Sequence, residues 1–353
     1  MRIIASTILI LTLLGILVLL GSCLNLTEPD PPRAEPWLCS INADGTGFRK
    51  IKKVDSSFGT NGFWDIYMTK DDRIIFYGEK LWISDTDSIN VAQITPDDLT
   101  MWKLPTRLSQ SPDGSKLFFA ADKNIYELSY PGYQLSKLTD QTIRWLRNPM
   151  VSDLGNYITY SSRGYGTPAK FTEYLYWMNI NSGKSGIIPT IDSICVNSYY
   201  SETEDYVYYE GVNIKRSRLD GSELSVVTTG GSMYPYASFD LSSDLRHIIH
   251  IWDETPTLDV LCFDKQLNTA IRLPIKQNSN ADYLARICKN VNKLFYVRPA
   301  PGVSQLLCVY DLDSGEYRVL TDNIANFTVG GFEMIAPSWD GSKVFFYAYV
   351  GYK

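Results

Sequence analysis

Apolar runs of three or four residues recur along the chain, and each follows a polar turn. In the clearest copy, Ser111-Pro112-Asp113-Gly114 leads into Leu117-Phe118-Phe119. Proline fixes the first corner of such a turn, aspartate bonds to its own backbone, and glycine accepts a positive φ. An unbroken apolar run of this length is typical of a strand that is covered on both faces. The pattern therefore predicts a turn followed by a buried strand.

The same combination of turn and apolar run occurs seven times. The first residues of the runs lie 41 to 50 residues apart, with a mean spacing of 45, which is the period of a four-stranded propeller blade. Each unit continues with a third strand and a hairpin such as Asp220-Gly221, and several close on an aliphatic residue followed by threonine, as at Leu138-Thr139. The seven first residues are Ile74, Leu117, Ile158, Val207, Ile248, Leu294 and Val344.

The two ends of the chain hold complementary parts of one unit. Residues 333–353 supply the first two strands of a seventh unit, and residues 37–54 supply a third and a fourth strand. Joining these segments completes a blade and removes the exposed strand edges of an open repeat array. The sequence thus predicts an all-β fold, a seven-bladed β-propeller of four-stranded blades, with six or eight blades as the alternatives.

The repeats resemble those of the TolB family, whose units carry a Ser-Pro-Asp-Gly turn, an aliphatic-Phe strand and a closing Leu-Thr. The best match runs from Ser111 to Thr139, and the resemblance covers residues 37–353. It implies a propeller fold and a role in binding, since TolB works with a peptidoglycan-associated lipoprotein. TolB itself has an α/β domain before a six-bladed propeller, for which this chain has no room.

The N-terminal segment has the pattern of an export signal, because Arg2 precedes an almost wholly apolar stretch from Ile3 to Leu20. Leu20-Gly21-Ser22-Cys23 resembles the lipobox of bacterial lipoproteins. The resemblance implies cleavage before Cys23 and attachment of diacylglycerol and a fatty acid such as palmitate; an uncleaved signal anchor is the alternative. We therefore divide the chain into a lipoprotein signal peptide (1–22), a Pro-rich tether (23–36) and the propeller domain (37–353).

This interpretation places the domain in the bacterial cell envelope, held to a membrane by the lipid on Cys23. Leu24, rather than an aspartate, follows the cysteine. In a cell with two membranes this favours the outer membrane, with the domain on its periplasmic or surface face. The prolines and charges of the tether make it a semi-extended spacer.

Charge and cysteine content narrow the range of partners and bonds. The 353 residues have a net charge of -6 and no basic cluster, so no nucleic-acid partner is expected. Five cysteines remain after Cys23, an odd number that rules out complete pairing. Cys39 and Cys308 occupy matching places in two repeats, which predicts small core residues; a Cys288–Cys308 disulfide is the one pairing considered.

No catalytic constellation is found in the sequence. His247 and His250 are three residues apart on one predicted strand, so their side chains point to opposite faces and cannot share a metal. Gly183-Lys184-Ser185 lacks the earlier glycine of a phosphate-binding loop, and residues 311–316 lack two ligand positions of a calcium loop. We therefore predict no metal, no cofactor and no enzymatic activity.

The candidate binding surface consists of loops that share one face around the channel mouth of the predicted propeller. Exposed aromatic residues combined with arginine are typical of partner or glycan recognition. For each aromatic residue, packing between blades is the alternative. The candidates are Trp64, Trp102, Arg144, Trp145, Arg163, Tyr165 and Tyr234.

Taken together, these features predict a lipid-anchored, monomeric envelope propeller that acts as a binding or scaffold module. Its partner would be an envelope protein, a peptide or a cell-wall glycan. The alternative is an enzyme acting on polysaccharide, a lyase or hydrolase, in which carboxylates such as Asp65 or Glu333 do the acid–base work.

Overall fold

The structure is a computed structural model that describes residues 34–352 apart from internal gaps. The described residues form strands, turns and loops, and contain no helix, so none of sufficient length and hydrophobicity to cross a membrane occurs among them. The gaps are residues 55–64, 87–90, 100, 102–106, 142–144, 164–172, 191–196, 211–212, 229–238, 243, 255–256, 267, 276–284, 289, 301–302, 323 and 325–326.

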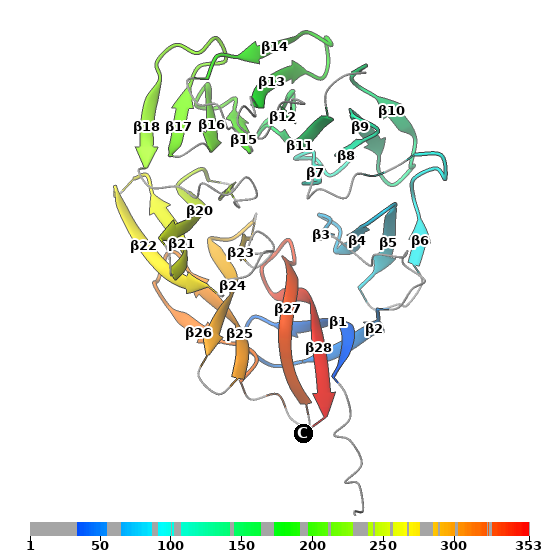
Figure 1. The fold of residues 1–353 in the computed structure, drawn as a ribbon, viewed down its shortest axis with the longest axis vertical. Coiled ribbons are helices and arrows are strands. Elements are labelled where there is room, and N and C mark those ends of the chain that lie inside the picture. The colour runs from blue at the N-terminus through cyan, green and yellow to red at the C-terminus, as the bar shows by residue number, and fades with distance from the viewer. Residues whose placement is uncertain are drawn as a thin grey trace, which may run out of the picture.

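The strands form seven four-stranded antiparallel sheets that surround a central axis like the blades of a propeller (Figure 1). We number the blades 1 to 7 in chain order, and the first strand of each lies nearest the axis. Blade 1 contains β3 (Asp65–Met68), β4 (Arg73–Tyr77), β5 (Leu81–Asp85) and β6 (Val91–Gln93). Blade 2 contains β7 (Ser109–Gln110), β8 (Lys116–Ala121), β9 (Asn124–Ser129) and β10 (Leu135–Lys137). Blade 3 contains β11 (Trp145–Val151), β12 (Tyr157–Arg163), β13 (Glu173–Asn179) and β14 (Ser185–Ile188).

The remaining blades repeat this meander. Blade 4 contains β15 (Ser198–Ser201), β16 (Tyr206–Glu210), β17 (Ile214–Ser217) and β18 (Ser225–Thr228). Blade 5 contains β19 (Phe239–Leu241), β20 (His247–Glu254), β21 (Thr257–Asp264) and β22 (Thr269–Ile275). Blade 6 contains β23 (Ala285–Ile287), β24 (Lys293–Ala300), β25 (Val303–Asp311) and β26 (Tyr317–Val319). Blade 7 combines β27 (Phe327–Pro337) and β28 (Lys343–Tyr352) with β1 (Glu35–Asn42) and β2 (Arg49–Lys53).

The second strand of every blade supplies the residue on which the repeat was recognised. All seven of these residues have no exposed surface, from Ile74 in β4 to Val344 in β28. Full burial of an aliphatic side chain of this size stabilises the fold by about 1.5–3 kcal/mol. The prediction of an all-β, seven-bladed propeller with four strands in each blade is confirmed.

The turn after the first strand is held by a serine–aspartate hydrogen-bond pair. The Ser111 hydroxyl donates to Asp113 Oδ1 (2.6 Å) and accepts from the backbone N–H of Lys116 (2.9 Å). Asp113 also accepts from the backbone N–H of Ser115 (3.0 Å), and Gly114 takes the positive φ of 82° that closes the turn. The same pair recurs as Thr69 with Asp71, Ser242 with Asp244 and Ser338 with Asp340.

Blade 3 closes this turn with an acid from the next blade. Its turn has Leu154 where the turns of blades 1, 2, 5 and 7 have aspartate. The Ser152 hydroxyl instead donates to Glu202 Oε1 of blade 4 at 2.5 Å, and the backbone N–H of Asn156 donates to the same oxygen at 2.9 Å. In return, Asp153 accepts from the backbone N–H of Glu202 at 2.6 Å. Blades 3 and 4 are therefore clasped together at their turns.

The threonine that closes several repeats caps the third strand of its own blade. Thr139 Oγ1 accepts from the backbone N–H of Ile125 at 2.9 Å, Thr95 does the same for Leu81 at 3.1 Å, and Thr321 for Leu307 at 3.0 Å. Each hydroxyl satisfies a buried donor that would otherwise cost free energy. The Leu-Thr signature is thus a structural cap.

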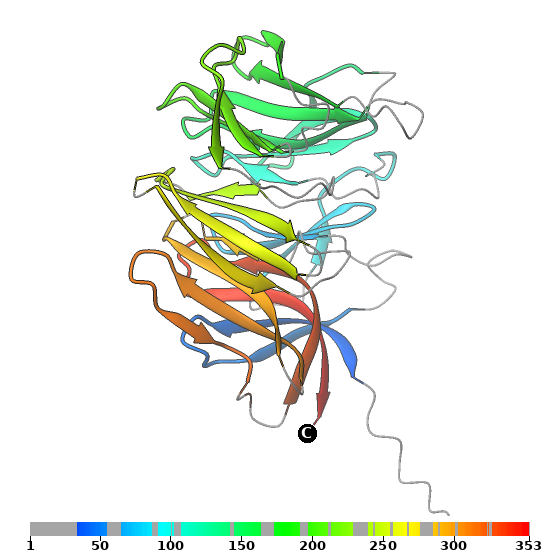
Figure 2. The same ribbon diagram turned by 60° about the vertical axis from the view of Figure 1, so that its left-hand side comes forward.

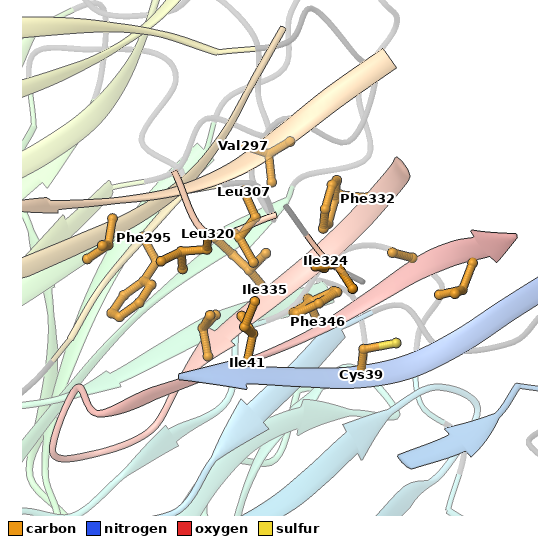
Figure 3. Packing of buried hydrophobic residues seen from close by; sticks show 14 of the residues in the cluster. Cys39, Ile41, Phe295, Val297, Leu307, Leu320, Ile324, Phe332, Ile335 and Phe346 are labelled. Atoms are coloured by element: carbon orange, nitrogen blue, oxygen red, sulfur yellow. The ribbon is translucent and has the colours of Figure 1, made fainter. Parts of the chain in front are cut away.

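Blade 7 is closed by strands from both ends of the chain, as predicted. β1 pairs with β28 over its full length, from Glu35 opposite Val350 to Asn42 opposite Lys343; Figure 2 shows the blue and red strands side by side. The side chains of Cys39 and Ile41 on β1 pack into a core shared by blades 6 and 7 (Figure 3). β27 begins at Phe327, before the predicted boundary of 333. Its pairing with β28 shifts register between Gly330 and Met334 and then continues to Phe327.

The four cysteines in the described part of the chain are buried and form no disulfide with one another. Cys39 and Cys308 have no exposed surface, which confirms that they are core residues. Cys288 donates to the carbonyl oxygens of Ser338 (3.2 Å) and Trp339 (3.1 Å), so the considered disulfide with Cys308 is not formed. Cys195 and Cys23 lie outside the described residues.

Candidate functional site: the axial pocket

The inner strands bring one residue from each blade to equivalent positions around the axis. In each blade this residue stands two positions before the first residue of the turn. In blade 2 that first turn residue is Ser111, whose backbone N–H donates to the Lys116 carbonyl across the turn (2.9 Å). The seven positions are occupied by different side chains rather than by a repeated type. In blade order they are Tyr67, Ser109, Met150, Tyr199, Asp240, Arg286 and Ala336.

Five of these residues line a single pocket with an empty volume of about 680 Å³, including its solvent-filled opening. The pocket draws its walls from six blades, and Trp339, in the turn of blade 7, lies at one part of the wall. Its charged lining residues in the described part of the chain are Asp65, Arg107, Asp240 and Arg286. A concave site with a few polar groups in apolar walls is the usual form of a ligand site.

Asp65 and Arg286 form an ion pair across this pocket. Arg286 Nη2 lies 3.2 Å from Asp65 Oδ2, and each side chain is only 14% exposed. The backbone N–H of Ile66 donates to the other carboxylate oxygen at 2.8 Å. The pair joins blade 1 to blade 6, and blade 7 lies between these two blades in the ring. Blade 7 has the small Ala336 at its axial position. A larger side chain there would occupy the same pocket.

Burial raises the pKa of the Asp65 carboxyl, and the positive charges of Arg286 and Arg107 act against that rise. Arg107 stands just before β7 and donates its backbone N–H to Asn148 Oδ1 at 3.1 Å. The Asp65 carboxylate therefore lies in the electrostatic field of two guanidinium groups.

Asp240 supplies negative charge on another side of the pocket. It is buried, and its Oδ1 accepts from the backbone N–H of Leu241 at 3.0 Å. Burial raises the pKa of Tyr67, and the charge of Asp240 raises it further. Burial also raises the pKa of Tyr199, and the charges of Asp153, Asp240, Glu202 and Glu204 add to that rise. Both phenols therefore stay protonated at neutral pH.

Most of the predicted loop residues lie outside the described part of the chain. Trp64, Trp102, Arg144, Tyr165 and Tyr234 fall in the gaps, and Cys23 precedes the first described residue. Arg163 is the last residue of β12, with its side chain outside the description. The predicted binding surface therefore stays a prediction at these positions.

Trp145 lies in a strand rather than in a loop. It opens β11 and pairs with Arg163 of β12, and Lys123 Nζ lies 5.3 Å from the centroid of its half-buried ring. Arg147, in the same predicted loop segment, is 3% exposed. The boundary was missed because β11 contains an irregularity between Arg147 and Met150, next to Pro149, which hides the strand pattern.

The two carboxylates named for acid–base work have different places. Asp65 lines the axial pocket, and Glu333 lies in β27 with its side chain outside the description. The other polar residues of the pocket, above all Asp240, Arg286 and Tyr67, were not singled out from the sequence. Counting two residues back from each recognised turn would have found them.

The described residues contain no group of three histidine, cysteine, aspartate or glutamate side chains that could hold a metal ion. His247 is buried, and its Nε2 lies 3.6 Å from Asp264 Oδ2. It sits at the turn end of blade 5, away from the residues that line the pocket. His250 follows on the same strand, with its side chain outside the description.

No protein-family model matches the sequence, and no curated protein matches it. Solved structures are similar in fold at low identity. An oligogalacturonate lyase in complex with manganese is 12% identical, with a TM-score of 0.58, over 82% of this chain and 89% of that one. TolB from Acinetobacter baumannii is 14% identical, with a TM-score of 0.50, over 90% of this chain and 65% of that one. A putative TolB from Agrobacterium tumefaciens is 16% identical, with a TM-score of 0.50, over 91% and 99%.

These likenesses concern the fold, since all three proteins are far below 25% identity. The chain spans 65% of the length of the Acinetobacter TolB. The repeated turn, the buried strand and the closing Leu-Thr predicted a propeller of this kind, and both the sheet order and the solved structures agree. The chain has a TolB-like β-propeller fold.

Proposed function

We propose that this chain is a binding module of the bacterial cell envelope that holds a protein, peptide or glycan partner over the opening of its axial pocket. The observation that carries the proposal is the pocket itself. It collects two carboxylates and two guanidinium groups on a scaffold whose other positions repeat from blade to blade. The likeness to TolB propellers supports a role in binding.

The proposal includes a membrane anchor at Cys23, followed by the Pro-rich tether of residues 23–36. Both rest on the lipobox pattern alone. In a cell with two membranes we propose the outer membrane as the site of attachment. Mass analysis of the mature N-terminus tests this part, because a diacylated or triacylated Cys23 supports it and an intact Met1 contradicts it.

A second candidate is an enzyme that acts on polysaccharide. It is favoured by the fold likeness to the oligogalacturonate lyase and by the carboxylate of Asp65 in the pocket. Incubation of the full chain with envelope and plant glycans would reveal it through new reducing ends or unsaturated products. Such products, lost in Asp65→Asn, would establish the enzyme and displace the binding proposal.

The binding function is tested by cross-linking the tagged full chain in the native envelope. We expect a defined partner to be captured by the unaltered chain, and capture to fall at least fivefold in Trp145→Ala. Ile187→Ala is the matched control, since Ile187 is 54% exposed on the outer strand β14 of the same blade. Equal capture by all three chains, or none with cross-linkers of several lengths, contradicts the proposal.

A further inference from the structure

We propose that two copies of this chain pair edge to edge through β14, the outer strand of blade 3, and so extend its sheet across a two-fold axis. The contact lies on the rim of the ring and goes beyond the proposed function, which concerns the axial pocket. It also differs from the monomer that the sequence predicts. β14 lies across the ring from β1 and β28, so the contact does not involve blade 7, where both ends of the chain meet (Figure 1).

The outer strands of the seven blades differ in how they discourage pairing with another chain. Each is the last strand of its sheet in the described part of the chain. Proteins usually protect such edges with lysine, arginine or proline, or keep the strand very short. Lysine or arginine occurs in β2, β10, β22 and β26, and β6 has only three residues. The remaining two, β14 and β18, have four residues each and contain no charged residue and no proline.

These two unprotected strands also expose apolar side chains. Ile187 on β14 is 54% exposed, Val226 on β18 is 52% exposed, and Leu224, just before β18, is 41% exposed. The two edges meet, because the position of a Cβ atom at Gly221, in the hairpin before β18, is 2.9 Å from Pro189 Cβ, just after β14. Exposed apolar residues along an unprotected edge are typical of a site that pairs with another chain.

Ile187 and Val226 lie on opposite sides of β14. Ile188 packs into the core shared by blades 3 and 4, and successive side chains of a strand alternate, so Ile187 points away from blade 4. Val226 is paired with Lys215, which is paired with Tyr209 of the same core. Val226 therefore belongs to the face of blade 4 that meets blade 3. A strand added along β14 would have an apolar side chain to contact on each of its faces.

The backbone of β14 offers hydrogen-bonding groups on its outer side. The Asn179 N–H donates to the Lys184 carbonyl at 2.8 Å where the ladder between β13 and β14 begins. Bonded pairs alternate along an antiparallel ladder, so Gly186 bonds to β13. The N–H and C=O groups of Ser185 and Ile187 therefore point outward, where no described strand pairs with them.

A second copy of the chain is the occupant that these features favour. In a symmetric contact identical residues from two copies meet, so a charged edge would bring like charges together, whereas β14 brings none. Antiparallel pairing with Ser185 of one copy opposite Ile187 of the other joins all the outward groups of these residues. A register shifted by two residues would place Ser185 opposite Pro189, whose nitrogen carries no hydrogen.

Sedimentation velocity of the full chain, in a density-matched non-ionic detergent, tests whether two copies pair. The contact is small, so we expect a reversible pair with a Kd in the micromolar range. Ile187→Lys places like charges in the contact and should raise this Kd about tenfold or more. Leu154→Lys is the matched control and should leave the Kd unchanged, since Leu154 is 62% exposed in the inner turn of the same blade. Circular dichroism checks that each variant is folded.

Cysteine cross-linking tests the register in the native envelope. Chains with Ser185→Cys and chains with Ile187→Cys are given different tags, produced together and oxidised. Directly opposite residues of an antiparallel pair lie within the span of a disulfide, so we expect a linked pair that carries both tags. The control is Lys137→Cys, on the outer strand β10 of blade 2, which should give no more linked pair than the unaltered chain.

The inference is overturned if the folded chain sediments as a single copy throughout the micromolar range, or if Ile187→Lys pairs as tightly as the unaltered chain. A disulfide link to a protein of different mass also overturns it, because β14 then holds a foreign strand. The proposed function is judged separately. Trp145→Ala should lose the axial partner and keep the pair of copies, whereas Ile187→Lys should lose the pair and keep the partner.

Discussion

The inner strands and their turns carry two sets of residues that lie only two positions apart in the chain. One set recurs from blade to blade, whereas the other differs in almost every blade. At the turns, a serine or threonine bonded to an aspartate recurs in blades 1, 2, 5 and 7. At the axial positions two residues earlier, the seven blades carry six different residue types. The turns meet the same backbone requirement in every blade. The axial side chains meet no such requirement and are free to form a pocket.

Blade 3 shows that the rule at the turns concerns a hydrogen-bonding need rather than a sequence motif. Leu154 has replaced the aspartate, yet the Ser152 hydroxyl still donates to a carboxylate, that of Glu202 in blade 4. A buried or half-buried donor must be satisfied by some acceptor. The turn positions are therefore constrained even where the repeat looks broken.

The largest expected effect separates a scaffold residue from a pocket residue of similar size. Phe119 is fully buried in the core of blades 1 and 2, so Phe119→Ala should lower the free energy of unfolding by about 3–5 kcal/mol. Met150 lines the pocket, where its removal enlarges an existing space, so Met150→Ala should cost about 1 kcal/mol. Urea unfolding measures both. Equal losses would contradict the division between scaffold and pocket.

A smaller effect is expected from the ion pair in the pocket. Arg286→Ala should cost about 2 kcal/mol at pH 7, because it leaves the Asp65 carboxylate buried without its guanidinium partner. In this variant the pKa of Asp65 should rise further above its unfolded value, so the folded protein binds the proton more tightly. The loss of free energy of unfolding caused by Arg286→Ala is then present at pH 7 and becomes smaller as the pH falls toward 4.

The pH dependence of this loss distinguishes a charge effect from lost packing. Arg286→Lys, which keeps the charge, should lose less stability than Arg286→Ala at pH 7. If urea unfolding gives the same loss for Arg286→Ala at pH 7 and pH 4, the carboxylate of Asp65 is not responsible for it.

The smallest expected effect lies at the turn of blade 2. Hydrogen bonds from Ser111 and Ser115 lower the pKa of Asp113 to about 2. A carboxyl group whose pKa is lower in the folded than in the unfolded protein stabilises the fold at pH values above the unfolded pKa. This stabilisation is lost as the pH falls toward the pKa of the folded state. Asp113→Asn should therefore cost less than about 1 kcal/mol at pH 6, since the group is exposed.

Thermal or urea unfolding at pH 6 and pH 3 checks this prediction. The difference between the unaltered chain and Asp113→Asn should be smaller at pH 3, where the aspartate is partly protonated in the unfolded chain. A difference that grows on acidification would show that the Asp113 carboxylate does not stabilise the turn.

Much of the fold could be predicted because its determinants are local. The turn residues, the buried apolar run and the closing threonine all act within one repeat, so each copy reports the same structure. Closure of blade 7 was also predictable, because the chain ends supplied complementary halves. Strand starts at Trp145 and Phe327 were missed, since irregular pairing interrupts the alternation on which such predictions depend.

The pocket could not be assembled from the sequence for a different reason. Asp65 and Arg286 are 221 residues apart in the chain, and only the curvature of the ring brings them together. Position in the repeat identifies which residues occupy the axial ring, but not which of them face one another. The side chains that carry the site chemistry are also those that the repeats leave free to vary.

Pairing of β1 with β28 has a mechanical consequence. Any pull on the chain before Glu35 is transmitted along β1, and the hydrogen bonds to β28 run perpendicular to the strands. Such a load shears all eight paired positions from Glu35 to Asn42 at once instead of opening them one by one. The seam of the ring is therefore oriented to resist tension from whatever holds the N-terminal side of the protein.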